Sequence, residues 1–265
     1  MKVTGTYRLQ LHSGFGFENA GQVVPYIASL GASHLYLSPI LQAARGSMHG
    51  YDVVDHTHIS AELGGREGFE ALAATAKEHG LGIIVDVVPN HMAFVAPESD
   101  NRPLWEVLRD GRDAPTSEWF DIDWRAGGGR LGLPLLGGDL ESVLEAGELS
   151  IDRIEVPHSE GLTELVIRYH DHVFPIAIGT EGDAQVGDTD TATLRAVLDR
   201  QHYRLASWRD KDDVLNYRRF FEVDGLIAVR VELKEVFDAT HALLLELHRD
   251  GLIDGFRIDH PDGLA

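Results

Sequence analysis

The 265-residue sequence contains no cysteine and is poor in basic residues. The absence of cysteine excludes disulfide bonds, a thiolate nucleophile and a zinc–thiolate site, and it fits a reducing cytosol. Only 23 Lys and Arg residues stand against 43 Asp and Glu residues, which gives a formal net charge of −20. This charge repels phosphate groups, so we expect neither a nucleic acid nor a membrane as a partner.

Two kinds of apolar segment are also missing. No apolar run reaches the roughly 18–20 residues of a membrane-spanning helix. Residues 1–8 lack the apolar stretch and small-residue cleavage site of a signal peptide. Hydrophobic residues still make up 43% of the chain, which is enough to fill a core and argues against disorder. The composition therefore predicts a folded, cytoplasmic protein.

In the first ninety residues, short apolar segments alternate with helical patterns. The patterns predict strands over 6–12, 34–37 and 83–88, helices over 20–30 and 66–79, and a long polar loop over 42–63. Apolar strands that alternate with helices are typical of a parallel sheet covered by helices. Residues 1–91 therefore predict an α/β fold and the first three strands of a (β/α)8 TIM barrel.

Residues 92–230 interrupt this alternation and predict an inserted subdomain. The segment is irregular, apart from a hairpin over 165–176 and a helix over about 195–207. Residues 231–265 then restore the pattern with a helix and a strand over 255–259. A complete barrel needs eight strands, so we expect only the first four in this chain.

Polar residues gather at the end of the third predicted strand. Asp86 lies among Ile and Val residues, and Asn90 and His91 follow just past the end of the strand. A buried carboxylate is costly unless it is paired or hydrogen-bonded, so a structural role is the simpler interpretation of Asp86 taken alone. Three polar groups at a strand end, where barrel active sites form, favour a site.

The fourth predicted strand carries a second polar group. Strand alternation places Arg257 and Asp259 on one face. A neighbouring Arg favours the ionised form of a carboxyl, and a glycosyl nucleophile must be ionised. The alternative is a buried ion pair that only orders the strand.

A polar loop after the second predicted strand contains His49, Gly50 and Tyr51. Tyr51 could present a flat ring to a sugar face while His49 donates to a sugar hydroxyl. A single loop tyrosine more often packs against its own protein, so this loop alone predicts little.

Taken together, these three groups resemble the α-amylase family of glycoside hydrolases and transglycosylases. Asp86, Asn90 and His91 are similar to the family's first conserved region, residues 255–260 to its second, and residues 49–51 to its sugar-stacking loop. The family places its domain B after the third strand, where the insertion lies. Further blocks resemble the family members that make trehalose-ended glucans, at residues 6–11, 36–39, 50–56 and 216–221.

The resemblance implies a role for each matched residue. Asp259 would be the nucleophile that forms a covalent glucosyl-enzyme, and Arg257 would keep it charged. The substrate-binding residues would be His49, Tyr51, Asp86, Asn90, His91 and His260. The implied reaction converts the reducing-end α-1,4 bond of a malto-oligosaccharide into an α,α-1,1 bond. The resemblance implies no cofactor, and it suggests functional coupling to a trehalose-releasing hydrolase.

The family's general acid/base lies on the fifth strand, which is not among the four predicted strands. We therefore expect the 265-residue chain to be inactive by itself. One alternative is an α-amylase-type hydrolase that uses water as the acceptor. Another is a glucan-binding module, which would need Tyr51 and His49 but not Arg257 or Asp259. The histidine pairs at 56–58 and 170–172 lack a third ligand at metal-site spacing, so we expect no metal.

Overall fold

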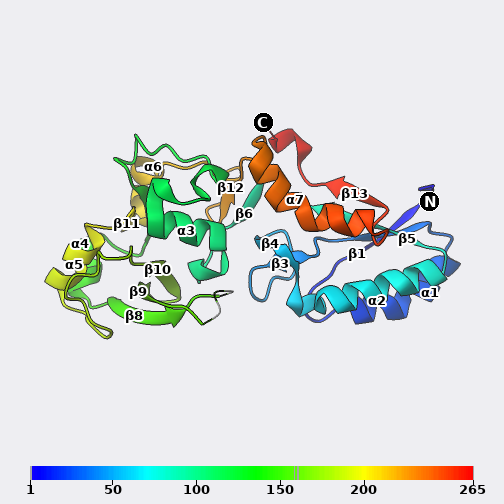
Figure 1. Cartoon of the computed structure of the whole chain (residues 1–265), viewed down its shortest axis with the longest axis horizontal. Helices are drawn as coiled ribbons and strands as arrows, with labels where there is room; N and C mark the ends of the chain where they lie inside the picture. The colour runs from blue at the N-terminus through cyan, green and yellow to red at the C-terminus, as the bar shows by residue number, and fades with distance from the viewer. Residues whose placement is uncertain (1, 158, 160, 265) are drawn as a thin grey trace. The chain divides into compact units, whose positions relative to one another are not determined.

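The computed structural model describes residues 2–157, 159 and 161–264. The chain divides into two compact units (Figure 1). Unit 1 comprises Met1–Ala93 and Val229–Ala265, and unit 2 comprises Phe94–Ala228. Within the described residues, no helix combines the length and the apolar character needed to cross a membrane.

Unit 1 is built on a four-stranded parallel sheet in the order β1–β2–β5–β13. These strands are β1 (Thr6–Leu9), β2 (His34–Leu37), β5 (Gly82–Val87) and β13 (Gly255–Ile258). The sheet is open at β1 and at β13, so the part of the chain that the structure describes holds four barrel strands and no closed barrel. The prediction of an α/β fold with the first four strands of a (β/α)8 barrel is confirmed.

Helices cover one face of this sheet. They are α1 (Phe17–Ser29), α2 (Gly65–Glu78) and α7 (Lys234–Arg249), and Figure 1 shows α1 and α2 running side by side. Alternate strand residues pack against them in one apolar core, which includes Leu35, Leu37, Ile83, Val85 and Val87 of the sheet and Val24, Ile27, Phe69, Leu72, Leu244 and Leu247 of the helices. The period-2 alternation leaves the opposite face of the sheet to polar side chains.

Helix α1 begins three residues earlier than predicted. The side-chain oxygen of Asn19 accepts a hydrogen bond from the backbone N–H of Gly16 at 3.2 Å, from within the first turn. Asn19 therefore satisfies a backbone group at the start of the helix without being the capping residue itself.

The prediction of a polar loop over 42–63 is wrong. The segment contains most of β3 (Leu41–Ala43), all of β4 (Val53–Ile59), with which β3 pairs in antiparallel fashion, and the 3₁₀ turn η1 (Ala61–Leu63). Val53, Val54 and Ile59 are buried, and so is His56. The burial of these few apolar residues against α2 and α7 stabilises a strand, although the polar residues around them favour a loop. The short strand β6 (His91–Ala93) also belongs to unit 1.

Unit 2 has more regular structure than its sequence indicated. Its helices are α3 (Arg102–Asp110), α4 (Leu140–Glu145), α5 (Thr191–Leu198) and α6 (Lys211–Val214), and its strands are β7 (Leu131–Leu136), β8 (Leu149–Glu155), β9 (Thr163–Tyr169), β10 (His172–Pro175), β11 (Tyr203–Ser207) and β12 (Leu226–Ala228). Short 3₁₀ turns connect them at Glu98–Asp100, Gly111–Asp113, Ser117–Trp119 and Trp208–Asp210, and a further one, Pro261–Gly263, lies in unit 1.

The predicted hairpin is present as β9 and β10, and β8 extends it into a three-stranded antiparallel sheet. The predicted helix over 195–207 is wrong from residue 199 onward, because α5 begins at Thr191 and ends at Leu198. Tyr203, Leu205 and Ser207 are buried on alternate positions of β11, which pairs in parallel with β7. This alternation is the period of a strand, and it decides the conformation of the segment.

Candidate active site

The centre of the candidate site is the Asp86 carboxylate, whose side chain is 0% exposed. Its Oδ1 accepts a hydrogen bond from Arg257 Nη1 at 2.9 Å. Its Oδ2 accepts from the hydroxyls of Tyr36 and Tyr51, both at 2.6 Å. Three donors and one positive charge offset the cost of burying this carboxylate in the middle of an apolar strand.

Arg257 joins this carboxylate to a second one. The register of β5 and β13 sets Arg257 opposite Asp86. The same Nη1 atom also donates to Oδ1 of Asp259 at 2.5 Å. These hydrogen bonds, first to Asp86 and then to Asp259, raise the pKa of Arg257 above its ordinary value. The Arg257 side chain is 45% exposed and that of Asp259 is 10% exposed. This ion pair therefore lies at the surface of the sheet face that the helices leave uncovered.

Asp86 and Asp259 are close enough to be compared with a pair of catalytic carboxyls. Their Oδ1 atoms share one nitrogen, at 2.9 and 2.5 Å, and so lie no farther apart than the roughly 5–5.5 Å typical of retaining glycosidases. Both oxygens of Asp86, however, accept hydrogen bonds from donors. Three donors already occupy the two oxygens of Asp86, so this carboxyl is placed to hold the site together and does not fit the role of general acid.

Asn90 fixes the backbone that carries Asp259. Its Nδ2 donates to the carbonyl oxygen of Asp259 at 3.0 Å and to that of His260 at 2.8 Å. The backbone N–H of Asp259 donates to the carbonyl of Val87 at 2.9 Å, which continues the β5–β13 pairing beyond the end of the strand. A Cβ atom at Gly263 would stand 3.1 Å from Oδ1 of Asn90, so the turn also packs closely on this amide.

Tyr51 and His91 form the side of the site next to the loop. His91 is buried, and its Nε2 lies 3.0 Å from the carbonyl oxygen of Tyr51, which positions the loop backbone. Burial lowers the pKa of His91. Burial, together with the hydrogen bond to Asp86, raises the pKa of Tyr51 to about 12, so its hydroxyl remains a donor at neutral pH.

His49 and His260 lie at the exposed margin of the site. His49 Nδ1 accepts from the backbone N–H of Tyr51 at 3.1 Å, and the two rings are 6.0 Å apart. His260 has a φ of 43°, in the left-handed region, and its exposed side chain has Nδ1 3.6 Å from Asp262 Oδ1. Neither imidazole joins the Asp86–Arg257–Asp259 hydrogen bonds that the structure shows.

Two residues of this site were not predicted from the sequence, namely Tyr36 and Arg8. Arg8 Nη2 donates to the Tyr51 hydroxyl at 3.2 Å, and its guanidinium lies 5.4 Å from the centre of the Tyr36 ring. Both residues alternate with apolar neighbours in β1 and β2, and their Cα atoms are partners in the register. The sequence does contain a signal for both residues, because each is a polar residue in an otherwise apolar barrel strand.

One histidine of each pair lies against a carboxylate. His58 Nδ1 lies 2.7 Å from Asp55, and His172 Nδ1 lies 2.5 Å from the buried Glu98. Among the residues that the structure describes, no group of three or more His, Asp or Glu side chains is placed to hold a metal ion.

Comparison with known proteins identifies relatives of two kinds. A family model described as the catalytic domain of alpha amylase matches residues 20–130. A shorter match of 33% identity over 101 residues, 38% of this chain and 14% of the relative, is to an alpha-amylase of Haloarcula japonica.

The longer matches cover nearly all of this chain. The structure of the maltooligosyltrehalose synthase from Arthrobacter ramosus superposes with a TM-score of 0.85 at 46% identity, over 98% of this chain and 31% of that one. A Mycobacterium tuberculosis protein provisionally named maltooligosyl trehalose synthase is 43% identical over 99% of this chain and 32% of its own length. The chain thus spans about a third of the length of these relatives, and along nearly all of its own length it is homologous to proteins named maltooligosyl trehalose synthase.

Proposed function

We propose that this chain carries the nucleophile side of a glucan-remodelling active site. The proposed reaction converts the reducing-end α-1,4 bond of a malto-oligosaccharide into an α,α-1,1 bond, as the synthase names of the relatives indicate. The observation that carries the proposal is the Arg257 bridge, which joins Asp259 to the buried Asp86 at adjacent strand ends. Barrel enzymes form their active sites at this end of the strands.

In the proposed first step, Asp259 attacks the anomeric carbon of the glucose unit on the non-reducing side of the scissile bond. Because Arg257 engages Oδ1, we assign the attack to Oδ2. The bond to the reducing-end glucose breaks as the ester forms, and the leaving oxygen takes up a proton. Three donors already engage the oxygens of Asp86, so we assign the general acid to polypeptide outside the 265 residues.

The second step sets the isomerase apart from a hydrolase. The released glucose must stay bound, turn, and attack the anomeric carbon of the glucosyl ester through its own anomeric hydroxyl. The bond to Asp259 then breaks and frees its carboxylate, while the acid group takes back the proton of the attacking hydroxyl. Water must be excluded, because water in place of this hydroxyl would give hydrolysis. The 265-residue chain supplies Asp259, Arg257 and Asp86 together with Tyr51, Asn90, His91, His49 and His260 as proposed sugar-contacting or positioning groups, and it is inactive alone.

We also propose a role for unit 2 as the domain-B-like insertion of this family. The supporting observation is its place in the chain, between the third and fourth strands of the sheet. An α-1,4-glucan is the proposed partner, and a trehalose-releasing hydrolase would act on the product. A cytoplasmic location stays a prediction from composition.

The test is a chimera in which this chain replaces the matching third of the A. ramosus synthase. With maltopentaose as substrate, we expect a trehalose-ended product that Asp259→Asn reduces by on the order of 10³-fold or more. Asp250→Asn, on the surface end of α7, is the matched control and should retain activity. Reducing sugar as the main product would favour the hydrolase instead, and turnover by the isolated 265-residue chain would refute the assignment of the acid to other polypeptide.

A further inference from the structure

Two polar side chains in and just after β1 reach the loop that carries Tyr51, and neither has a part in the proposed chemistry. Arg8 lies in β1, and Gln10 follows the strand by one residue. Because they are two residues apart, strand alternation places both on the same side of the chain. Both belong to the block 6–11, which resembles the family members that make trehalose-ended glucans. The proposed reaction gives that block no role.

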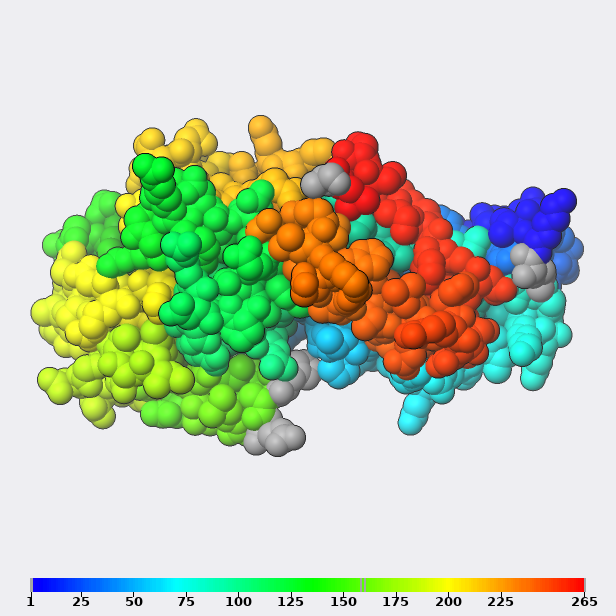
Figure 2. Space-filling view, turned by 45° about the horizontal axis from the view of Figure 1, so that its top comes forward, coloured from blue at the N-terminus to red at the C-terminus, as the bar shows by residue number. Residues whose placement is uncertain are grey.

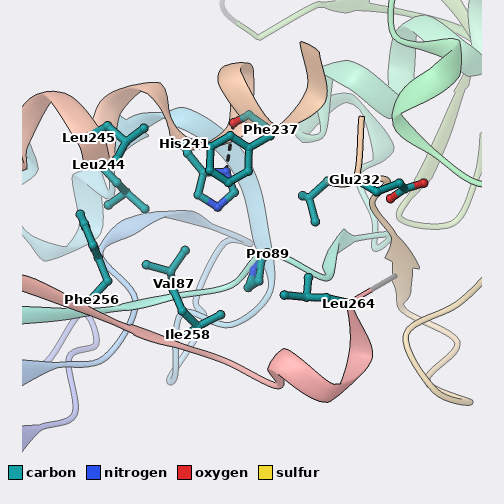
Figure 3. Close-up of a pocket in the computed structure, with 11 residues that line it drawn as sticks. Val87, Pro89, Glu232, Phe237, His241, Leu244, Leu245, Phe256, Ile258 and Leu264 are labelled. Atoms are coloured by element: carbon teal, nitrogen blue, oxygen red, sulfur yellow. Dashed lines mark hydrogen bonds between the residues drawn. The ribbon is translucent and has the colours of Figure 1, made fainter. Parts of the chain in front are cut away.

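The register of the sheet places Arg8 on the face that carries the candidate site. Arg8 is the register partner of Tyr36, whose hydroxyl donates to Asp86 on the next strand. Figure 3 shows the other face of the sheet, where Val87 and Phe256 lie between the strands and α7 in an apolar groove. Arg8 is exposed on β1, which is an edge of the sheet in the described residues, and Figure 2 shows residues near the N-terminus (dark blue) at the surface of unit 1. The guanidinium therefore lies beside the site, on its accessible side.

Arg8 determines the direction of the Tyr51 hydroxyl. Its Nη2 donates to that hydroxyl oxygen at 3.2 Å, and its guanidinium carbon is 5.4 Å from the centre of the Tyr36 ring. A guanidinium has donors and no acceptor, so Tyr51 cannot donate its single hydrogen to Arg8. That hydrogen is directed to Oδ2 of Asp86 at 2.6 Å. The positive charge behind the hydroxyl also strengthens this donation, because successive hydrogen bonds polarise one another.

Gln10 fixes the backbone next to Tyr51. Its Nε2 donates to the carbonyl oxygens of His49 at 3.2 Å and of Met48 at 3.4 Å. The side chain of His49 is 54% exposed and Met48 is 58% exposed, so this part of the loop faces solvent. A solvent-exposed loop keeps a single conformation through specific contacts of this kind. The hydroxyl of Tyr51 therefore meets Arg8 from a backbone that is already positioned.

We propose that Arg8 is a positioning residue for the glucose unit that Asp259 attacks, and that it acts through Tyr51. This rests on the proposed function, which supplies the glucan and places Tyr51 among the groups that contact it. Arg8 holds the hydroxyl end of the Tyr51 side chain, while the Tyr51 carbonyl oxygen lies 3.0 Å from His91 Nε2. A ring held at both ends sets the position of the glucose unit relative to Asp259. A misplacement of about 1 Å can cost on the order of 100-fold in rate, so this contact controls turnover without touching the reacting atoms.

The experiment measures maltopentaose turnover by the chimera with the A. ramosus synthase. Arg8→Met removes the donor and nearly keeps the length of the side chain, and we expect kcat/KM to fall by about tenfold or more. Arg8→Lys restores a donor and a positive charge and should recover most of this loss. Because Arg8 acts through a hydroxyl, Arg8→Met should have a further effect of less than about twofold in the Tyr51→Phe chimera. Arg204→Met, at an exposed position of β11, is the matched control and should leave kcat/KM unchanged.

A second measurement does not depend on turnover. In the 265-residue chain, Arg8→Met should speed hydrogen exchange at the backbone amide of Tyr51, which donates to His49 Nδ1 at 3.1 Å, whereas Arg204→Met should not. Circular dichroism checks that the variants are folded.

Three results would each overturn the proposal: the same loss from Arg8→Met with and without the Tyr51 hydroxyl, no recovery with Arg8→Lys, or unchanged hydrogen exchange at Tyr51. Failure of the proposed function gives a different result. An unaltered chimera that forms no product, together with faster exchange at Tyr51 in Arg8→Met, would overturn the proposed function and leave the anchoring of Tyr51 by Arg8 standing.

Discussion

Removing the hydroxyl of Tyr36 or Tyr51 is the sharpest test of how Asp86 is stabilised. Each tyrosine donates at 2.6 Å to Oδ2 of a carboxylate whose side chain is 0% exposed. Hydrogen bonds to charged groups contribute about 1.5–3 kcal/mol, and an unsatisfied buried acceptor costs the full desolvation of that group. We therefore expect Tyr36→Phe and Tyr51→Phe each to lower the free energy of unfolding by about 1.5–3 kcal/mol.

Urea unfolding followed by circular dichroism measures this change. The control is Tyr26→Phe, which removes the same atom from a side chain on α1 that is 61% exposed, and it should alter the free energy by less than about 0.5 kcal/mol. The double variant Tyr36→Phe/Tyr51→Phe should depart from additivity by roughly 0.5–3 kcal/mol, because both hydroxyls share one oxygen atom. Single variants as stable as the control, or an additive double variant, would refute stabilisation of Asp86 by these two hydroxyls.

Two further predictions concern protonation and packing. Burial, with a smaller contribution from His241, lowers the pKa of His56 to about 4, below the roughly 6.5 of an unfolded chain. The folded state therefore binds fewer protons between these values, so stability is complete above about pH 6.5 and falls toward pH 4 by up to about 1.4 kcal/mol per unit. Urea unfolding at pH 5 and pH 7 measures how steeply the free energy of unfolding depends on pH. His56→Gln should reduce this dependence, whereas the control His79→Gln should not. Equal dependence in the two variants would contradict the prediction. In unit 2, a Cβ at Gly132 would stand 2.0 Å from a backbone carbonyl, so Gly132→Ala should cost about 1–3 kcal/mol or more in thermal unfolding, whereas Gly21→Ala, with open space around it, should not destabilise.

The parts of the fold that follow one period over several residues could be predicted from the sequence. Helix α2 and strand β5 differ from their predicted bounds by a single residue at each end, because their apolar residues recur at clear helical and strand spacings. Strand β4 could not be predicted, since its burial comes from packing on α2 and α7, which no local pattern records. The end of α5 at Leu198 was missed for a similar reason, because β11 is stabilised as a strand by pairing with a distant segment, β7.

The candidate site was predictable where polar residues interrupt apolar strands. Asp86, Arg257 and Asp259 stand out for that reason, and the structure brings all three into one hydrogen-bonded group. The contribution of Tyr36 depends on the register between β2 and β5, which the sequence does not state. His49 and His260 lie outside this group because of the conformations of their loops, including the positive φ of His260. Loop conformations leave no periodic pattern in the sequence from which they could be predicted.

The most direct test of the proposed nucleophile is to identify the residue that becomes glycosylated. The chimera with the A. ramosus synthase would be incubated with a slow fluorinated α-glucosyl donor, digested, and analysed by mass spectrometry. We expect a covalent hexosyl adduct on the peptide that contains Asp259, and no adduct in the Asp259→Asn form. An adduct on Asp86 or on any other carboxyl, or normal turnover by the Asp259→Asn chimera, would contradict the assignment of Asp259 as the nucleophile.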